Sequence, residues 1–275
     1  MPATLSVTAT GRSGGTTLVL VARHFEDLKG PEIAQAIGPG SILLWPIGAV
    51  EQHGPHLPLS VDHVIADTVA SAVADAAPPE LDVWLLPTLS VSKSNEHAWS
   101  PGTLWLSATT LLAVVADVAR SIATTSAQRL VFLNAHGGNS SLLNVACREI
   151  RLEHGLLTFL AHPSLPPDQG GDSATSEMGM GIHGGLGETS MMLHLRPDLV
   201  DMSKATRQIP EPLADNDHVR FGGSVTFGWL SNDFGPDGHI GDPTGATADR
   251  GKILFEEAVS TIIEQLHEIA AFGAP

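Results

Sequence analysis

Carboxylates and imidazoles are concentrated between Glu51 and Asp62, in the stretch EQHGPHLPLSVD. Glu51 and His53 are two residues apart, so both side chains project to one side if the chain stays extended after a strand over 43–47. Asp62 follows a loop stiffened by two prolines and begins an apolar stretch with helical spacing, so its carboxylate can return to the same point. The three residues are therefore predicted to form half of a metal site.

The mixture of donor atoms indicates which metals such a site would take. A carboxylate such as Asp62 can bridge two cations that lie roughly 3.5–4 Å apart and share a water. Oxygen and nitrogen donors suit zinc, manganese or iron better than calcium, which takes oxygen alone. We expect two divalent ions, with zinc ahead of manganese and iron. A zinc-class ion lowers the pKa of bound water to about 7, so a metal-bound hydroxide is the expected nucleophile.

Further polar clusters follow other predicted strands. His136, in the sequence NAHGGN, stands just after an apolar strand and is a candidate third ligand. Glu188, in HGGLGETS, is predicted to open a helix and to serve as a further ligand and a catalytic carboxylate. His183 begins that cluster and is the candidate proton donor to a leaving nitrogen. Glu96 and His97 are expected to lie around the ligands.

Length, charge and cysteine content narrow the class of protein. With 275 residues and 43% hydrophobic content, we expect a single domain over 1–275. The net charge of −16, from 30 acidic and 14 basic residues, argues against a nucleic-acid partner. Cys147 is the one cysteine, so a disulfide within the chain is excluded. The chain has no long apolar run and no secretory signal, so we expect no membrane partner and a cytoplasmic location.

Hydrophobic periodicity predicts alternating strands and helices. The expected strands are 17–22, 41–46, 81–86, 130–134 and 156–160, and the expected helices are 32–37, 62 to about 77, 107–124, 141–153 and 248–271. Ser107 is a plausible N-cap, and 163–181 is predicted to be a long loop that could cover the site. This alternation predicts an α/β fold whose parallel or mixed sheet has helices on both faces. Ligands in such folds bind beyond the carboxyl ends of the strands.

Other interpretations of these residues are weaker. Gly179, Gly181 and Gly184 spell GxGxxG, but a polar loop rather than a strand precedes them, so a dinucleotide site is not supported. Glu51, His53 and Asp62 could instead form a polar turn that is closed by ion pairs. The lack of basic residues nearby disfavours this alternative.

Several segments together resemble the creatininase, or creatinine amidohydrolase, family. They are PIGAVEQHGPHLPLSVD at 46–62, EHAWSPGTLWLS at 96–107, NAHGGN at 134–139, HGGLGETS at 183–190 and GDPTGATADRG at 241–251. The resemblance implies a three-layer α/β/α sandwich with a mostly parallel sheet, a two-metal site, a homohexamer, and hydrolysis of carbon–nitrogen bonds other than ordinary peptide bonds. It places Glu51, Asp62 and His136 around one metal, His53 and Asp62 around the other, and His183 as the general acid.

Two features depart from the pattern of creatininase itself. Gly138 stands where creatininase has a metal-binding glutamate, and Glu188 is the expected substitute. The segment 163–182 has no tryptophan, whereas creatininase closes tryptophans over its substrate from there. The leading prediction is therefore a dinuclear metal-dependent amidohydrolase for a small cyclic amide, lactam or formamide. The alternatives are a peptidase that matures a mycofactocin-type precursor peptide and a non-catalytic, degenerate homologue.

Overall fold

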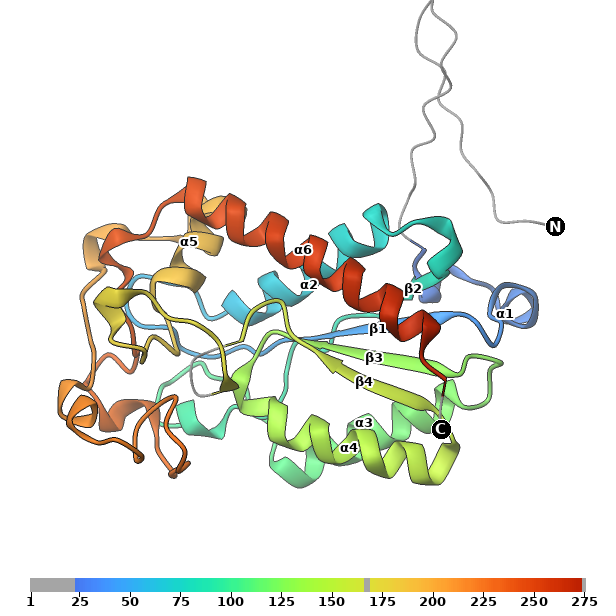
Figure 1. Ribbon diagram of the computed structural model, residues 1–275, viewed down its shortest axis with the longest axis horizontal. Coiled ribbons are helices and arrows are strands. Elements are labelled where there is room, and N and C mark those ends of the chain that lie inside the picture. The colour runs from blue at the N-terminus through green and yellow to red at the C-terminus, as the bar shows by residue number, and fades with distance from the viewer. Residues whose placement is uncertain (1–22, 166–168, 274–275) are drawn as a thin grey trace, which may run out of the picture.

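A parallel sheet forms the centre of the computed structural model, which describes residues 23–165 and 169–273 (Figure 1). In this part of the chain the sheet has four strands in the order β2-β1-β3-β4, and each neighbouring pair is parallel. The strands are β1 (Ile42–Ile47), β2 (Val83–Leu85), β3 (Arg129–Asn134) and β4 (Leu157–Ala161). β1 is buried along its whole length because both faces of the sheet are covered.

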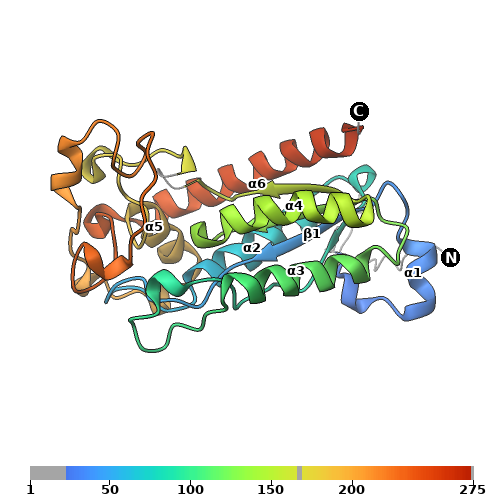
Figure 2. The same cartoon turned by 90° about the horizontal axis from the view of Figure 1, so that it is seen from below.

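Helices form a layer on each face of this sheet (Figures 1 and 2). The helices are α1 (Gly30–Ala36), α2 (Val61–Ala76), α3 (Ala108–Ile122), α4 (Ser140–His154), α5 (Leu186–Leu195) and α6 (Ala248–Ala271). One buried cluster joins the sheet to α2, α5 and α6, and a second joins it to α3 and α4. The predicted three-layer α/β/α sandwich is confirmed.

The alternation of side chains along β1 explains why two cores exist. Ile42 and Leu44 lie in the cluster with α2 and α6, whereas Leu43 and Trp45 lie in the cluster with α3 and α4. Successive side chains of a strand point to opposite faces, so an uninterrupted apolar strand supplies both cores at once.

Most predicted elements are present with ends shifted by one or two residues, and α6 has the predicted bounds. The predicted strand at 17–22 lies outside the described residues. The segment 163–181 has a short 3₁₀ helix, Thr175–Glu177, and no α-helix or strand among its described residues. Between α5 and α6 the chain runs through turns and short 3₁₀ helices, which periodicity did not predict.

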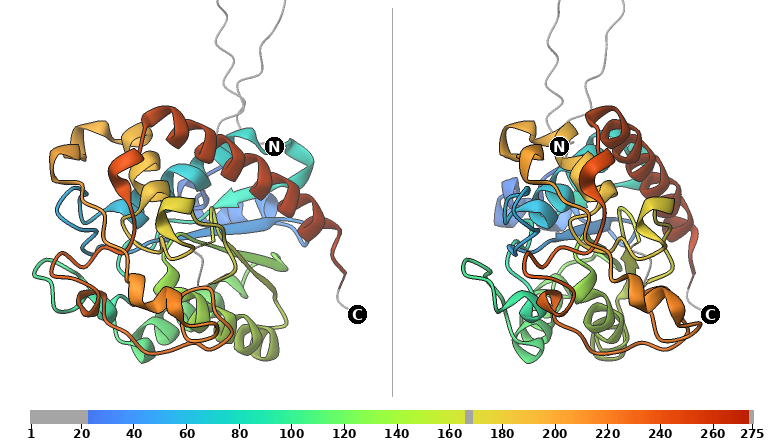
Figure 3. Two further views of the ribbon diagram at one scale, coloured as in Figure 1. Left: turned by 60° about the vertical axis from the view of Figure 1, so that its left-hand side comes forward. Right: turned by 90° about the vertical axis from the view of Figure 1, so that its left-hand side faces the viewer.

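The carboxyl ends of β1 and β3 lie side by side and define where a ligand would bind. Ile47 pairs with Asn134, and the amide of Ala135 donates to the carbonyl of Ile47 at 2.9 Å. The segments that flank α5 coil over this end of the sheet (Figure 3). The polar clusters that follow β1 and β3 are therefore brought together.

No helix in the described part of the chain has both the length and the apolar character needed to cross a bilayer.

The N-cap of α3 gives a prediction about stability. The hydroxyl of Ser107 accepts a hydrogen bond from the amide of Thr110 at 3.2 Å. Replacing Ser107 with Ala should lower the free energy of unfolding by about 1 kcal/mol, because this amide loses its partner. The measurement is denaturant unfolding. Thr109→Ala, an exposed change in the same helical turn, should not destabilise the protein, and equal losses in both variants would contradict the capping role.

Candidate metal centre

Four buried imidazoles surround one oxygen of a buried carboxylate, Oε1 of Glu51, beyond the end of β1. Nε2 of His97 and Nδ1 of His136 each lie 3.3 Å from this oxygen. Nδ1 of His183 lies at 3.6 Å and Nε2 of His53 at 3.9 Å. Among the described residues, no lysine or arginine pairs with Glu51. The charge of this carboxylate therefore has no permanent protein cation beside it.

Asp62 lies between two of these imidazoles. Its Oδ1 is 3.1 Å from Nε2 of His53, and its Oδ2 is 3.2 Å from Nδ1 of His136. Oδ2 is buried and, within the described part of the chain, has no hydrogen bond. Asp62 stands in the first turn of α2, where the helix dipole favours a negative charge. Each oxygen thus faces a different imidazole, which is the arrangement that a bridging carboxylate requires.

Three of the imidazoles are anchored by backbone carbonyls on the side away from the carboxylates. A carbonyl only accepts hydrogen bonds, so the ring nitrogen that faces it must carry the hydrogen. The anchors are Glu51 O for Nδ1 of His53 at 3.1 Å, Lys93 O for Nε2 of His136 at 2.8 Å, and Gln52 O for Nε2 of His183 at 2.6 Å. In each neutral ring the other nitrogen then presents its lone pair to carboxylate oxygens. Such a contact is repulsive unless a cation lies between the two groups, and metal-binding histidines are oriented in this way.

Glu188 completes the set from the first turn of α5. Its Oε2 accepts a hydrogen bond from the amide of Gly184 at 2.6 Å and lies 3.9 Å from Nε2 of His53. Burial raises the pKa of Glu188, and despite the opposing effect of His53 the pKa reaches about 7. This carboxyl group is therefore poised between its protonated and ionised forms.

The structure brings all six predicted site residues together. One atom each from Glu51, Asp62 and His136 lie within 4.8 Å of one another, and so do single atoms of His53, His183 and Glu188. A third set at this spacing is Glu51, His97 and His183, so distance alone would also admit His97 as a ligand. The donor set, the unpaired Oδ2 of Asp62 and the inward lone pairs all fit two divalent cations. His183 was predicted as an acid only, but its position also allows it to act as a ligand.

The pKa values of the imidazoles follow the same pattern. Burial lowers the pKa of His53, but Asp62, Glu188 and Glu51 outweigh this effect and raise it to about 9. Burial likewise opposes a charge on His136, yet Glu51 and Asp62 hold its pKa well above the ordinary value. Protons thus occupy, in the metal-free protein, the places that cations would take. Burial, with the neighbouring imidazoles, holds the pKa of His183 well below the ordinary value, so this ring is neutral.

Gly138 is explained by the carboxylate of Glu96. A Cβ built at position 138 would overlap Oε1 of Glu96 and would lie 2.5 Å from Nε2 of His136. Glu96 is buried, lies 3.6 Å from Nε2 of His136 and accepts a hydrogen bond from Nζ of Lys93 at 2.6 Å. The space beside His136 is therefore filled from another segment, and the glycine is a packing requirement.

Sequence reasoning missed several residues that hold the site in place. The hydroxyl of Ser94 donates to Oε2 of Glu51. Asn139 accepts from the amide of Lys93 at 3.2 Å, which fixes the carbonyl anchor of His136. Glu177, buried in the aperiodic loop, accepts from the amide of Leu186 at 2.9 Å and thereby holds the start of α5. Asn139 lies inside a cluster that was recognised, whereas nothing in the sequence around Glu177 pointed to its role.

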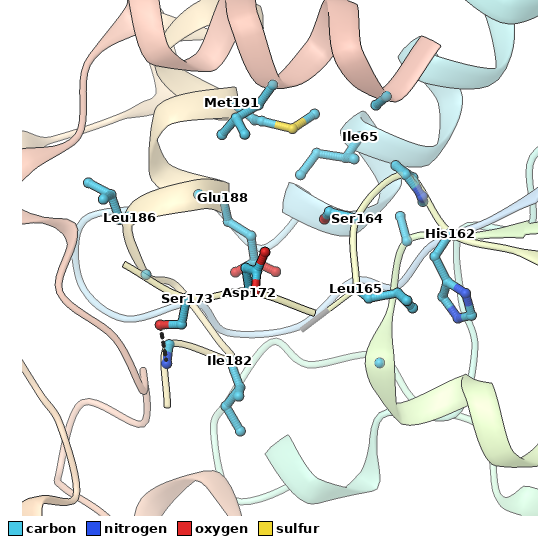
Figure 4. A pocket seen from close by; sticks show the side chains of 18 of the residues that line it. Ile65, His162, Ser164, Leu165, Asp172, Ser173, Ile182, Leu186, Glu188 and Met191 are labelled. Atoms are coloured by element: carbon cyan, nitrogen blue, oxygen red, sulfur yellow. Dashed lines mark hydrogen bonds between the residues drawn. The ribbon is translucent and has the colours of Figure 1, made fainter. Parts of the chain in front are cut away.

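Two cavities border this centre, and each has a volume of about 350 Å³. Both are lined by Gly137, Ile182, His183 and Glu188. The first lies between α2, α5, α6 and the loop before His183, with apolar walls that include Ile65 and Met191, and Glu188 extends into it from α5 (Figure 4). The second is lined by Glu51, Asp62, His136 and the aromatic side chains of Phe227 and Trp229. A tryptophan thus borders the site, but from a different segment than the one before His183.

Comparisons with known proteins agree with this geometry. A family model described as "Creatininase: Creatinine amidohydrolase" matches residues 26–266. A "Mycofactocin precursor peptide peptidase" from Mycobacterium ulcerans is 35% identical over 230 residues, which cover 82% of this chain and 84% of the relative. The "Creatinine amidohydrolase" of Pseudomonas putida is 30% identical over 244 residues, covering 82% of this chain and 89% of the relative. A solved structure titled "Creatininase Mn" superposes with a TM-score of 0.69 at 25% identity, covering 90% of this chain and 98% of the other.

The position of Asp62 between two imidazoles leads to a prediction about metal content. Replacing Asp62 with Ala should remove both ions together, because each of its oxygens faces one half of the ligand set. Elemental analysis after dialysis measures the loss. Asp67→Ala, an exposed change on the same helix, should keep both ions, and an Asp62→Ala variant with one fully occupied site would show that Asp62 does not bridge.

A second prediction concerns the space at Gly138. Gly138→Ala should destabilise the protein by about 1–3 kcal/mol, because the new methyl group overlaps the carboxylate of Glu96. Combining it with Glu96→Ala should recover part of that loss in denaturant unfolding. Gly38→Ala, where an added Cβ meets nothing within 4 Å, serves as the control. An unfolding free energy for Gly138→Ala equal to that of the control would mean that Glu96 moves aside freely.

Proposed function

The chain belongs to the creatininase family of hydrolases, and from this premise we propose that it is a metal-dependent peptidase that cleaves a precursor peptide of the mycofactocin type. The observation that carries the proposal is the pair of cavities that both have His183 and Glu188 in their linings. A substrate held there can extend in two directions from the reacting bond. A peptide has this shape, and the relative from Mycobacterium ulcerans bears the corresponding name.

The two cavities differ in chemical character, which suits a substrate with different groups on either side of the bond. The first has aliphatic and thioether groups, including Ile65, Leu186 and Met191, together with charged side chains such as Asp172 and Arg250. The second contains the ligand carboxylates and the aromatic rings of Phe227 and Trp229. Pockets of this size lined by apolar groups and a few placed polar groups are typical of ligand sites.

In this proposal Glu51, Asp62 and His136 would hold one divalent ion, and His53, Asp62 and Glu188 would hold the other. Two such ions, when bound, activate water at neutral pH and offset negative charge on the carbonyl oxygen under attack. The protein contributes fixed ligand positions, because backbone carbonyls orient His53 and His136. Zinc and manganese are both compatible with this mixed donor set.

His183 is the residue that we propose moves the proton. Its Nε2–H is bound to the carbonyl of Gln52 at 2.6 Å, and its Nδ1 faces the centre. Because this ring is neutral, Nδ1 can accept a proton from the attacking water and then donate it to the leaving nitrogen. The general acid predicted from sequence therefore acts first as a base. If His183 were a ligand of the second ion, its Nδ1 could not accept this proton. The roles of metal ligand and proton acceptor therefore exclude each other.

A second candidate function is hydrolysis of a small cyclic amide, lactam or formamide. The relative from Pseudomonas putida, named a creatinine amidohydrolase, favours it. Such a compact substrate would fill one of the two cavities and leave the other without a role. Assembly as a hexamer and a cytoplasmic location stay predictions from sequence.

The experiment that separates these functions incubates the zinc- or manganese-loaded protein with a mycofactocin precursor peptide and, separately, with creatinine, lactams and formamides. We expect cleavage of the peptide, detected by mass spectrometry, and a loss of about 10²–10⁴-fold in rate for His183→Ala. Turnover of a small amide with an intact peptide would favour the second candidate. A metal-replete protein that turns over neither class would indicate the non-catalytic homologue.

A further inference from the structure

His97 differs from the other imidazoles around Glu51 in what lies on its outer side. It ends the 3₁₀ helix Asn95–His97 and is buried, with its ring centroid 4.2 Å from that of His183. Its Nε2 faces Oε1 of Glu51 at 3.3 Å, and its Nδ1 lies 2.9 Å from Nε2 of Gln52. The outer partner of this ring is thus a side-chain amide rather than a backbone carbonyl.

The backbone determines which way the amide of Gln52 points. Its Nε2 lies 2.9 Å from the carbonyl oxygen of Gly238, and its Oε1 accepts a hydrogen bond from the amide of Gly54 at 2.8 Å. Reversing the amide would bring two oxygens together at Gly238 and two N–H groups together at Gly54. The two hydrogens of this NH₂ group therefore face Gly238 and the ring of His97, both at 2.9 Å, because the contacts of the same nitrogen with Nε2 of His183 and Oγ of Ser231 are longer, at 3.3 Å.

This orientation assigns the proton of His97. The NH₂ group of Gln52 can only donate, so Nδ1 of His97 must accept and carries no hydrogen. The one ring proton of His97 then sits on Nε2, which faces Glu51. In the neutral forms of His53, His136 and His183 the outer nitrogen carries the hydrogen and the inner nitrogen presents a lone pair.

We propose that His97 is a positioning residue for Glu51 and not a metal ligand, and that Gln52 sets this role by holding His97 in the Nε2–H form. The inference rests on the metal centre of the proposed function. Nε2 of His97 lies 3.3 Å from Oε1 of Glu51, a close contact rather than a hydrogen bond, while the hydroxyl of Ser94 donates to Oε2. Both groups are neutral, so they hold the carboxylate in place and leave its negative charge available to a cation. A lysine or arginine at the same place would compete with the metal for that charge.

Paired substitutions at two histidines test the inference by metal affinity. Glutamine places an N–H donor near the position of Nε2 but has no ring nitrogen to give to a metal. His97→Gln should therefore bind zinc within a few-fold of the unsubstituted protein, whereas His97→Ala should lose about 10–100-fold in affinity. At His136, a proposed ligand, Gln and Ala should be equally damaging. Competition titration with a chelator measures these affinities, and a His97→Gln variant as weak as His97→Ala would overturn the proposal.

A second measurement reads the tautomer directly and needs neither metal nor substrate. In protein labelled with ¹⁵N at histidine, the signals lost in His97→Gln identify His97. They should show an unprotonated Nδ1 and a protonated Nε2. Gln52→Glu, which offers only acceptors, should move the proton to Nδ1. An Nδ1–H form in the unsubstituted protein, or an unchanged tautomer in Gln52→Glu, would refute the role of Gln52.

The two readouts also keep this inference distinct from the proposed function. If the unsubstituted protein binds no zinc or manganese, the proposed function fails, but the tautomer of His97 is still measured. If the protein binds metal and cleaves peptide while His97→Gln loses zinc as His136→Gln does, the function stands and the role of His97 is wrong. Thermal unfolding of each metal-free variant checks that it is folded.

Discussion

Four imidazoles lie close to Oε1 of Glu51, and the arrangement of the rest of the centre depends on this crowding. In a buried setting an unpaired carboxylate is costly, and the neutral rings of His53, His136 and His183, which turn lone pairs toward carboxylate oxygens, increase the cost. Protons or metal ions must therefore lie between these groups. The chain is acidic overall, and the nearest lysine, Lys93, does not neutralise Glu51 because it is paired with Glu96. The arrangement is stable only with cations, and this explains why so many polar groups converge without basic partners.

Orientation of the rings depends on the backbone more than on other side chains. Carbonyls of residues 51, 52 and 93 each hold one ring nitrogen, so the tautomers of three histidines follow from the path of the main chain. Asn139 and Asn134 in turn hold the loop that carries Lys93 against the end of β3. A site built on backbone anchors is rigid, because displacing one ring requires moving a strand end or the start of a helix.

The sheet supplies the geometry that makes these contacts possible. β1 and β3 are neighbours and parallel, so the polar segments after them leave the same edge. Asp62 and Glu188 stand in the first turns of α2 and α5, where backbone N–H groups and the helix dipole favour carboxylates. Two strand ends and two helix starts therefore converge on one point, and the loops that flank α5 shape the cavities around it.

Many of the helices, strands and site residues could be predicted from the sequence, because they depend on local patterns. The four-residue spacing of Ile65, Val69 and Val73 predicted α2, and the apolar run before Asn134 predicted β3, since burial patterns repeat with the period of each element. Clusters of Glu, His and Asp after predicted strands identified the six site residues before any distance between them was known.

Contacts between segments that are distant in the chain could not be predicted from the sequence. That Glu96 fills the space at Gly138, that Glu177 holds α5, and that the 196–247 segment brings Trp229 to the site all depend on packing between segments remote in the chain.

The division between sequence and structure is clearest at the histidines. The sequence by itself determined which residues carry imidazoles and that they follow strand ends, because residue type and periodicity are local properties. Only the tertiary structure decided which nitrogen of each ring faces the centre. That choice depends on the group that lies nearest to the outer nitrogen, a carbonyl for His53, His136 and His183 and an amide NH₂ for His97. Such a partner comes from the folded path of the chain, so no spacing in the sequence encodes it.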